Sequence, residues 1–72
     1  MDFSLREGEE FIKLGQLLKA AGLVGNGSDA KYVIMQGDVC VNGETCLMRG
    51  KKITDGDTVE FEGETIHVHS VS

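Results

Sequence analysis

Basic residues gather in the middle of this chain, where their types and spacing suit the binding of a polyanion. Arg49, Lys51 and Lys52 stand almost side by side, and further lysines precede them at positions 13, 19 and 31. Lysine supplies a compact positive charge, and the planar guanidinium of arginine can hold two phosphate oxygens at once. These residue types indicate a phosphate-binding surface.

The net charge of the chain, −5, argues against a polyanionic partner until it is divided along the sequence. Residues 1–10 carry −3 and residues 55–72 carry −5, whereas residues 11–54 carry +3. A basic face with an acidic back satisfies these numbers, and anion binding depends on the local field. Solvated surface charges explain the same cluster, so composition alone leaves both interpretations open.

Four side chains offer a second kind of chemistry, a zinc site formed by Cys40, Cys46, His67 and His69. Thiolates and imidazoles are good zinc ligands, but their spacing here matches no metal motif. If Asn42-Gly43 is a two-residue turn, Cys40 lies opposite Thr45 and the two sulfurs project to opposite faces. We therefore expect two free thiols, no disulfide, no metal and no cofactor, with both histidines on the polar face of the last strand.

The tetrapeptide Ser28-Asp29-Ala30-Lys31 matches the Ser-x-x-Lys motif of some acyl-transfer enzymes. Ser28 is also well placed to cap a helix. A chain of 72 residues builds one domain with a small core and no room for a large catalytic cleft. The sequence therefore predicts a binding protein and not an enzyme.

Two short helices are expected to position the basic residues. Apolar residues at positions 14, 17, 18 and 21 predict a helix over about 13–21 that Gly22 ends. A second helix is expected to run from an N-cap at Ser28 to about Gln36, to bury positions 30, 33 and 34, and to end at Gly37. A glycine-rich turn joins them into a helical hairpin.

The carboxyl half predicts a small antiparallel sheet. Residues 39–41 alternate as a strand, Asn42-Gly43 is a strong hairpin signal, and residues 44–48 can return as the partner strand. Positions 59–61 and 66–68 alternate as two more strands. Residues 1–10 show no clear period and are expected to be a short leading strand or a frayed end. Together these elements predict an α+β fold, with a helical hairpin packed on the sheet.

Two further features bear on location. No stretch is long and apolar enough to span a bilayer, and the acidic amino terminus lacks the layout of a signal peptide. We therefore expect a cytoplasmic protein whose cysteines are reduced.

The order of these motifs resembles the alpha-L RNA-binding domain named after ribosomal protein S4. The residues that carry the resemblance are Lys13-Leu14 with Leu18, Ala30-Lys31, Gln36-Gly37-Asp38-Val39 with Val41-Asn42-Gly43, and Gly56-Asp57 with Val59. The motif covers about residues 13–61 of an expected single domain, 1–72. Within the family, Leu-Gly-Gln-x-Leu-Lys at 14–19 and Arg-Gly-x-Lys at 49–52 look like the small stand-alone bacterial proteins similar to YaaA and YbcJ. Many family members place Ser-Arg before the second helix, where this chain has Asn26-Gly27.

The resemblance implies non-enzymatic binding of structured RNA, with ribosomal RNA or a ribosomal particle as the expected partner. The residues that it implies at the RNA are Lys13, Lys31, Asn42, Arg49, Lys51 and Lys52. Lys19 lies outside the apolar stripe of its helix and joins this predicted surface. Tyr32, if exposed, is a further candidate for a base or ribose contact. Neither the RNA nor the oligomeric state follows from the sequence.

An alternative assigns the same turns to a β-grasp protein. Val41-Asn42-Gly43-Glu44 and the turn at Asp55-Gly56-Asp57 are also similar to small β-grasp proteins, including sulfur carriers that dock on protein partners. Those carriers need a carboxyl-terminal diglycine, whereas this chain ends Ser70-Val71-Ser72. The alternative is therefore a protein-protein interaction module without carrier chemistry. A helical hairpin before the strands favours RNA binding, and two strands before a single helix favour the β-grasp.

Overall fold

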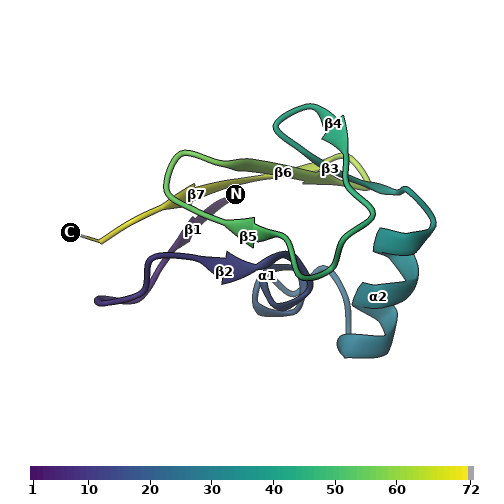
Figure 1. Cartoon of the computed structure of the whole chain (residues 1–72), viewed down its shortest axis with the longest axis horizontal. Helices are drawn as coiled ribbons and strands as arrows, with labels where there is room; N and C mark the ends of the chain where they lie inside the picture. The colour runs from purple at the N-terminus through teal and green to yellow at the C-terminus, as the bar shows by residue number, and fades with distance from the viewer. Residues whose placement is uncertain (72) are drawn as a thin grey trace.

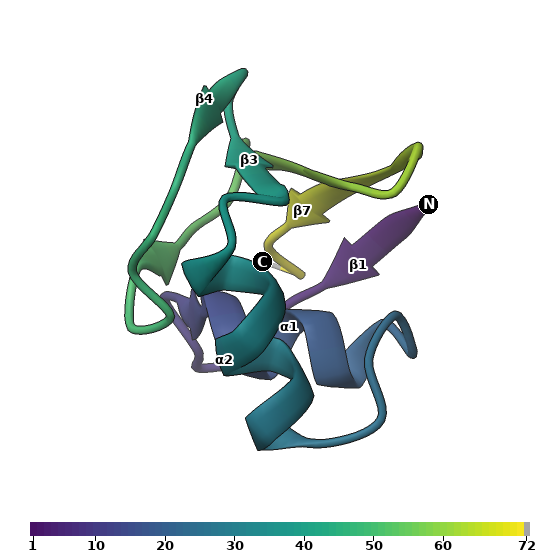
Figure 2. The ribbon, with the colours of Figure 1, turned by 90° about the vertical axis from the view of Figure 1, so that its right-hand side faces the viewer.

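Two helices and seven strands make up residues 1–71, which the computed structural model describes. The helices are α1 (Leu14–Ala20) and α2 (Gly27–Met35), and the strands are β1 (Asp2–Ser4), β2 (Ile12–Lys13), β3 (Val39–Val41), β4 (Glu44–Thr45), β5 (Lys52–Ile53), β6 (Thr58–Phe61) and β7 (Glu64–His69). Figures 1 and 2 show both helices on the same side of the sheet that contains β3 and β7. The predicted α+β fold with a helical hairpin is confirmed.

The larger sheet is mixed, with strand order β1-β7-β6-β3-β4. Its neighbours are antiparallel except β1 and β7, which run parallel with Phe3 level with Val68. The antiparallel sheet predicted for the carboxyl half is confirmed in β3, β4, β6 and β7, whereas the parallel pairing of β1 was not predicted. The leading segment, which the sequence left open between strand and frayed end, covers an edge of β7 that would otherwise present unpaired backbone groups.

A second, two-stranded sheet pairs β2 with β5. Ile12 lies opposite Ile53, and Lys13 lies opposite Lys52. Each strand has only two residues, which is too short for the alternation of apolar and polar residues that predicts strands. This pairing was not predicted, and it brings two of the expected RNA-binding lysines together.

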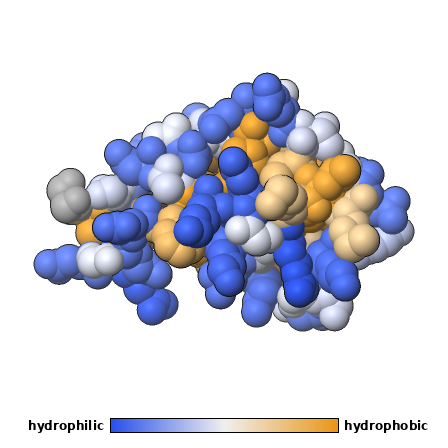
Figure 3. Space-filling view, viewed as in Figure 1, coloured by the Kyte–Doolittle hydropathy of each residue, from blue (hydrophilic) through white to orange (hydrophobic). Residues whose placement is uncertain are grey.

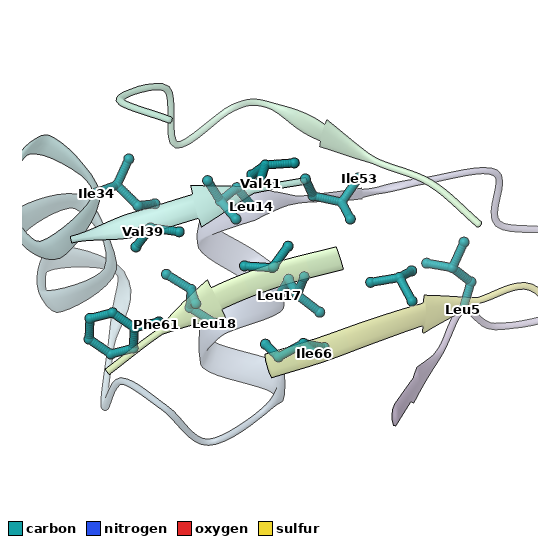
Figure 4. Packing of buried hydrophobic residues seen from close by; sticks show 12 residues of the cluster. Leu5, Leu14, Leu17, Leu18, Ile34, Val39, Val41, Ile53, Phe61 and Ile66 are labelled. Atoms are coloured by element: carbon teal, nitrogen blue, oxygen red, sulfur yellow. The ribbon is translucent and has the colours of Figure 1, made fainter. Parts of the chain in front are cut away.

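Side chains from both helices, both sheets and the segment after β1 form one core, which Figure 4 shows from close by. The buried members of the core are Leu5, Leu14, Leu17, Leu18, Ile34, Val39, Val41, Ile53, Val59, Phe61, Ile66 and Val68. Buried and accessible positions alternate along β3, β6 and β7. On α2, Ala30 and Ile34 are buried and Val33 packs against the core. The predicted core faces of the strands and of the second helix are confirmed.

The turn at Asn42-Gly43 has two residues, as predicted, since Val41 pairs with Glu44 and Cys40 with Thr45. Both turn residues have positive φ, 52° and 84°, which a type I′ turn requires. The return strand β4 ends at Thr45, sooner than the expected 44–48. Cys40 and Cys46 are free thiols, and only Cys46 packs against the core.

The order of the elements separates the two folds that the sequence left open. Two consecutive helices, α1 and α2, precede the β3–β4 hairpin. A β-grasp requires two strands and then a single helix. The strands that precede α1 lie in different sheets, so the β-grasp arrangement is absent from residues 1–71.

The start of α2 corrects one prediction. Asn26 has an extended backbone, φ −159° and ψ 177°, and its Oδ1 accepts the Asp29 N–H at 2.9 Å. Asn26 is therefore the N-cap, and Ser28 lies within the first turn. Asparagine and serine cap helices about equally well, so the sequence alone could not choose between two candidates only two residues apart.

This assignment is testable by substitution. Asn26→Ala removes the cap and is expected to lower the free energy of unfolding by about 1 kcal/mol. Ser28→Ala, as the control, is expected to change it by less than about 0.5 kcal/mol. Urea unfolding followed by circular dichroism compares the two variants. A larger loss for Ser28→Ala would show that serine caps α2 in solution.

Candidate nucleic-acid interface

The loop at 46–51, which we call the basic loop, is fastened to the start of α1 by backbone hydrogen bonds. Leu14 N–H donates to the Lys51 carbonyl at 2.9 Å, and Gly15 N–H donates to the Arg49 carbonyl at 3.0 Å. The first N–H groups of a helix have no partner within it, and the side chain of Lys13 at the N-cap makes no capping bond. The loop backbone therefore caps α1, and this fixes where Arg49 and Lys51 leave the main chain.

Gly15 lies where α1, α2 and this loop meet. A Cβ added at Gly15 would be 3.6 Å from Arg49 Cβ and 3.8 Å from Ala30 Cβ. These are ordinary contact distances, so a methyl group fits and a longer side chain would push the loop away from the helices. The small residue keeps the three segments close together.

A cleft of about 310 Å³ opens beside Gly15. We call it the basic cleft; its lining residues are Lys13, Gly15, Gln16, Lys19, Gly27, Ala30, Arg49 and Gly50. Three of the predicted residues, Lys13, Lys19 and Arg49, thus share one cleft. Gln16 was not predicted as a site residue, although the spacing 13, 16, 19 places it on the same helical face.

Within residues 1–71, the cations of the basic cleft have no anionic partner. The one salt bridge in the described part of the chain joins His69 to Asp2, on the larger sheet. The side chains of Lys13, Lys19 and Arg49 are exposed. An anionic ligand can therefore reach them without first displacing a carboxylate.

The other predicted residues on helices and strands lie around this cleft and not in it. Lys52 lies level with Lys13, and its Nζ is 4.9 Å from the centre of the Phe11 ring, a cation–π contact that helps to place the charge. Lys31 is exposed on α2 but does not line the basic cleft. Tyr32 beside it is 57% exposed, which meets the condition set for it as a contact residue.

A second depression, of about 480 Å³, contains the remaining two predicted residues. We call it the hairpin groove; it is lined by Val41, Asn42, Glu44, Thr45, Cys46, Leu47, Met48 and Lys51. The Asn42 amide is already engaged, since Oδ1 accepts the Thr58 N–H at 2.9 Å and Nδ2 donates to Asp57 Oδ1 at 3.1 Å. One amide hydrogen and one oxygen lone pair of Asn42 remain for a ligand.

Asp57 links the Asn42-Gly43 turn to Thr54, the residue that follows β5. Its Oδ2 accepts the Thr54 N–H at 2.8 Å and the Thr54 hydroxyl at 3.2 Å, while Oδ1 accepts from Asn42. Partial burial raises the pKa of Asp57, but these hydrogen bonds and the nearby Lys51 charge outweigh it and hold the pKa below 3.8. The Asn42-Gly43 and Gly56-Asp57 motifs are therefore joined by a direct side-chain hydrogen bond.

The polar face of the larger sheet holds the two histidines, as predicted. His69 Nε2 and Asp2 Oδ1 share a hydrogen bond of 3.1 Å, which lowers the pKa of Asp2. Within residues 1–71, no three His, Cys, Asp or Glu side chains are grouped so as to hold a metal ion. Neither of the helices described is long and apolar enough to cross a membrane.

Comparison with known proteins shows which protein family this chain is similar to. A model of the S4 domain matches residues 3–69. The chain is 44% identical over 54 residues to the "Probable ribosome maturation protein RlbA" of Bacillus subtilis (strain 168), covering 75% of this chain and 76% of that protein. It is 37% identical over 57 residues to YbcJ of Escherichia coli (strain K12), covering 79% and 81%.

A solved structure agrees with the sequence comparison. The solution structure of YbcJ from E. coli superposes with a TM-score of 0.69 at 35% identity, covering 94% of this chain and 85% of YbcJ. That structure is described as revealing an alpha-L motif involved in RNA binding.

The role assigned to Asp57 predicts a pH dependence. Asp57→Asn keeps the shape but removes the charge that accepts three hydrogen bonds, and we expect it to lower the free energy of unfolding at pH 7 by about 1 kcal/mol. A depressed pKa in the folded state stabilises the fold above the unfolded pKa, and this contribution disappears as the pH falls through the folded pKa. The difference between wild type and variant should therefore shrink below about pH 4.

Urea unfolding at pH 7 and at about pH 3 measures this difference. Asp55→Asn, whose carboxylate accepts the Ser70 N–H, is the neighbouring control. A deficit for Asp57→Asn that is the same at both pH values would contradict a charged Asp57 as the fastening group.

Proposed function

The chain belongs to the S4 domain family, and we propose on this basis that it binds structured RNA, without catalysis, by seating RNA phosphates in the basic cleft. The observation that carries the proposal is the convergence of three cations without carboxylate partners, Lys13, Lys19 and Arg49, on one cleft. Such cations attract phosphate, and they lie in the segment of the chain whose charge is +3.

The residues of the basic cleft contribute different interactions to phosphate binding. The Arg49 guanidinium can hold two oxygens of one phosphate, while Lys13 and Lys19 act as point charges and Gln16 donates from its amide. Gly27 and Gly50 have no Cβ, which leaves room for an RNA backbone to approach closely. Lys31, Lys51, Lys52 and Asn42 make the outer contacts in this proposal.

Ribosomal RNA, free or within a ribosomal particle, is the partner that we propose, with binding in the cytoplasm. The name of the B. subtilis relative refers to ribosome maturation, and the YbcJ structure is described by an RNA-binding motif. The far hairpin of the larger sheet carries exposed Glu60, Glu62 and Glu64. This acidic side repels nucleic acid and therefore limits RNA to the basic side of the molecule.

Two arginine variants test whether RNA affinity depends on the basic cleft or only on the net charge of the protein. Arg49→Gln is expected to weaken binding to a structured ribosomal RNA fragment by about tenfold, because a phosphate contact worth roughly 1.4 kcal/mol is lost. Arg6→Gln removes the same charge from a residue that does not line the basic cleft, and we expect less than about a twofold change. Fluorescence anisotropy with labelled RNA gives both affinities.

The salt dependence of the same measurement tests the mechanism. The plot of log affinity against log salt has a negative slope. Its magnitude should decrease by about one for Arg49→Gln and stay unchanged for Arg6→Gln. Equal losses for the two variants would show that overall charge, and not the basic cleft, determines binding. No binding of the wild type at low salt to any folded RNA would overturn the proposed function.

A further inference from the structure

Large apolar side chains lie exposed on α2 and on the loop that follows β4. On α2 these are Tyr32 and Met35, at 57% and 61% exposure, and on the loop they are Leu47 and Met48, at 60% and 66%. Figure 3 shows hydrophobic surface gathered between the end of β4 and α2, on a face that is otherwise largely hydrophilic. The core does not use these side chains, and exposed apolar patches of this kind mark binding surfaces. Leu47 and Met48 directly precede Arg49, a cation of the basic cleft.

Leu47 and Met48 also line the hairpin groove. Together with Val41 and Cys46 they give the hairpin groove its apolar walls. Its volume of about 480 Å³ lies within the range of about 300–1,000 Å³ that is usual for small-molecule sites. A flat aromatic group can therefore enter the hairpin groove edge-on and contact aliphatic and sulfur atoms on its faces.

The loop at 48–51 separates this groove from the basic cleft. Arg49 and Gly50 line the basic cleft, whereas Met48 and Lys51, on either side of them in the chain, line the hairpin groove. A ligand bound at Arg49 through a phosphate therefore has its next group beside an apolar wall with one cation, Lys51. Phosphates joined to flat, mostly apolar rings are the chemistry of a polynucleotide.

The polar atoms at the groove add a preference. A carboxylate such as that of Glu44 accepts hydrogen bonds and donates none, and Asn42 has one amide hydrogen and one lone pair left. Adenine, cytosine and guanine carry an exocyclic amino group that donates to a carboxylate, whereas uracil carries none. Glu44 also repels phosphate, so it favours a base over a backbone group at this point.

We propose that the hairpin groove receives one unpaired base of the RNA whose phosphates lie in the basic cleft, with a preference for bases that have an exocyclic amino group. The inference rests on the proposed function and narrows its substrate to folded RNA with a bulged or looped-out nucleotide. Such nucleotides are accessible to proteins because their faces and edges are free of pairing.

The test uses RNA hairpins that differ at one position. One carries a single bulged adenosine, the second carries an abasic residue at the same place with the same number of phosphates, and the third carries a bulged uridine. We expect the wild type to bind the adenosine hairpin about tenfold more tightly than the abasic one, the scale of one stacked base, with uridine between them. Glu44→Gln should bring adenosine and uridine closer together.

The double variant Leu47→Ser, Met48→Ser should lose the preference for adenosine and keep the affinity for the abasic hairpin. Met35→Ser, equally exposed but outside the groove, is the matched control and should keep the preference. As a measurement independent of any variant, 2-aminopurine at the bulge should change its fluorescence when the wild-type protein binds.

Two results would overturn the inference in distinguishable ways. Equal affinity of the wild type for the adenosine and abasic hairpins would refute base binding while RNA binding stands, and the apolar side chains would then be free for a protein partner. Absence of binding to all three hairpins at low salt would refute the proposed function and the base site together.

Discussion

The site depends on the hydrogen bonds that Leu14 and Gly15 donate to the Lys51 and Arg49 carbonyls. They satisfy helix donors that no side chain caps, and they hold the basic loop against α1. The β2–β5 pairing continues this contact between the two segments and places Lys13 opposite Lys52. Beyond β5, Asp57 accepts hydrogen bonds from Thr54 and Asn42. The main chain that carries the loop cations is thus held at Arg49, at Lys51 and past β5 before any ligand arrives.

This arrangement explains how a protein with a net charge of −5 can bind a polyanion. Five of the carboxylates lie in the segment 55–72, three of them exposed on the β6–β7 hairpin, while within residues 1–71 the cations of the basic cleft converge without carboxylate partners. Attraction is governed by the local field, and the acidic side reduces contact in wrong orientations. Net charge alone predicts a cationic partner, whereas the division of charge along the chain predicts an anionic one.

Most of the fold was predictable because its elements are marked by local signals. The leucine spacing of α1, the alternation in β3, β6 and β7, and the Asn42-Gly43 turn each act within a few residues. The two-residue strands β2 and β5, the parallel pairing of β1, and the choice of Asn26 over Ser28 depend on contacts between distant segments or on near-equal local choices. For the site, the sequence named three cations of the basic cleft but could not show that Lys31 lies outside it. Leu47 and Met48 were expected to be ordinary strand residues, because an early end of β4 has no local signal.

The most direct test of the basic cleft is an NMR titration of ¹⁵N-labelled protein with a structured ribosomal RNA fragment at low salt. We expect amide shift changes at residues 13–19, 27–30 and 49–52, with the acidic hairpin at 60–64 unchanged. Changes centred on residues 58–69, or no changes at all, would contradict the claim that RNA binds where the basic loop meets α1.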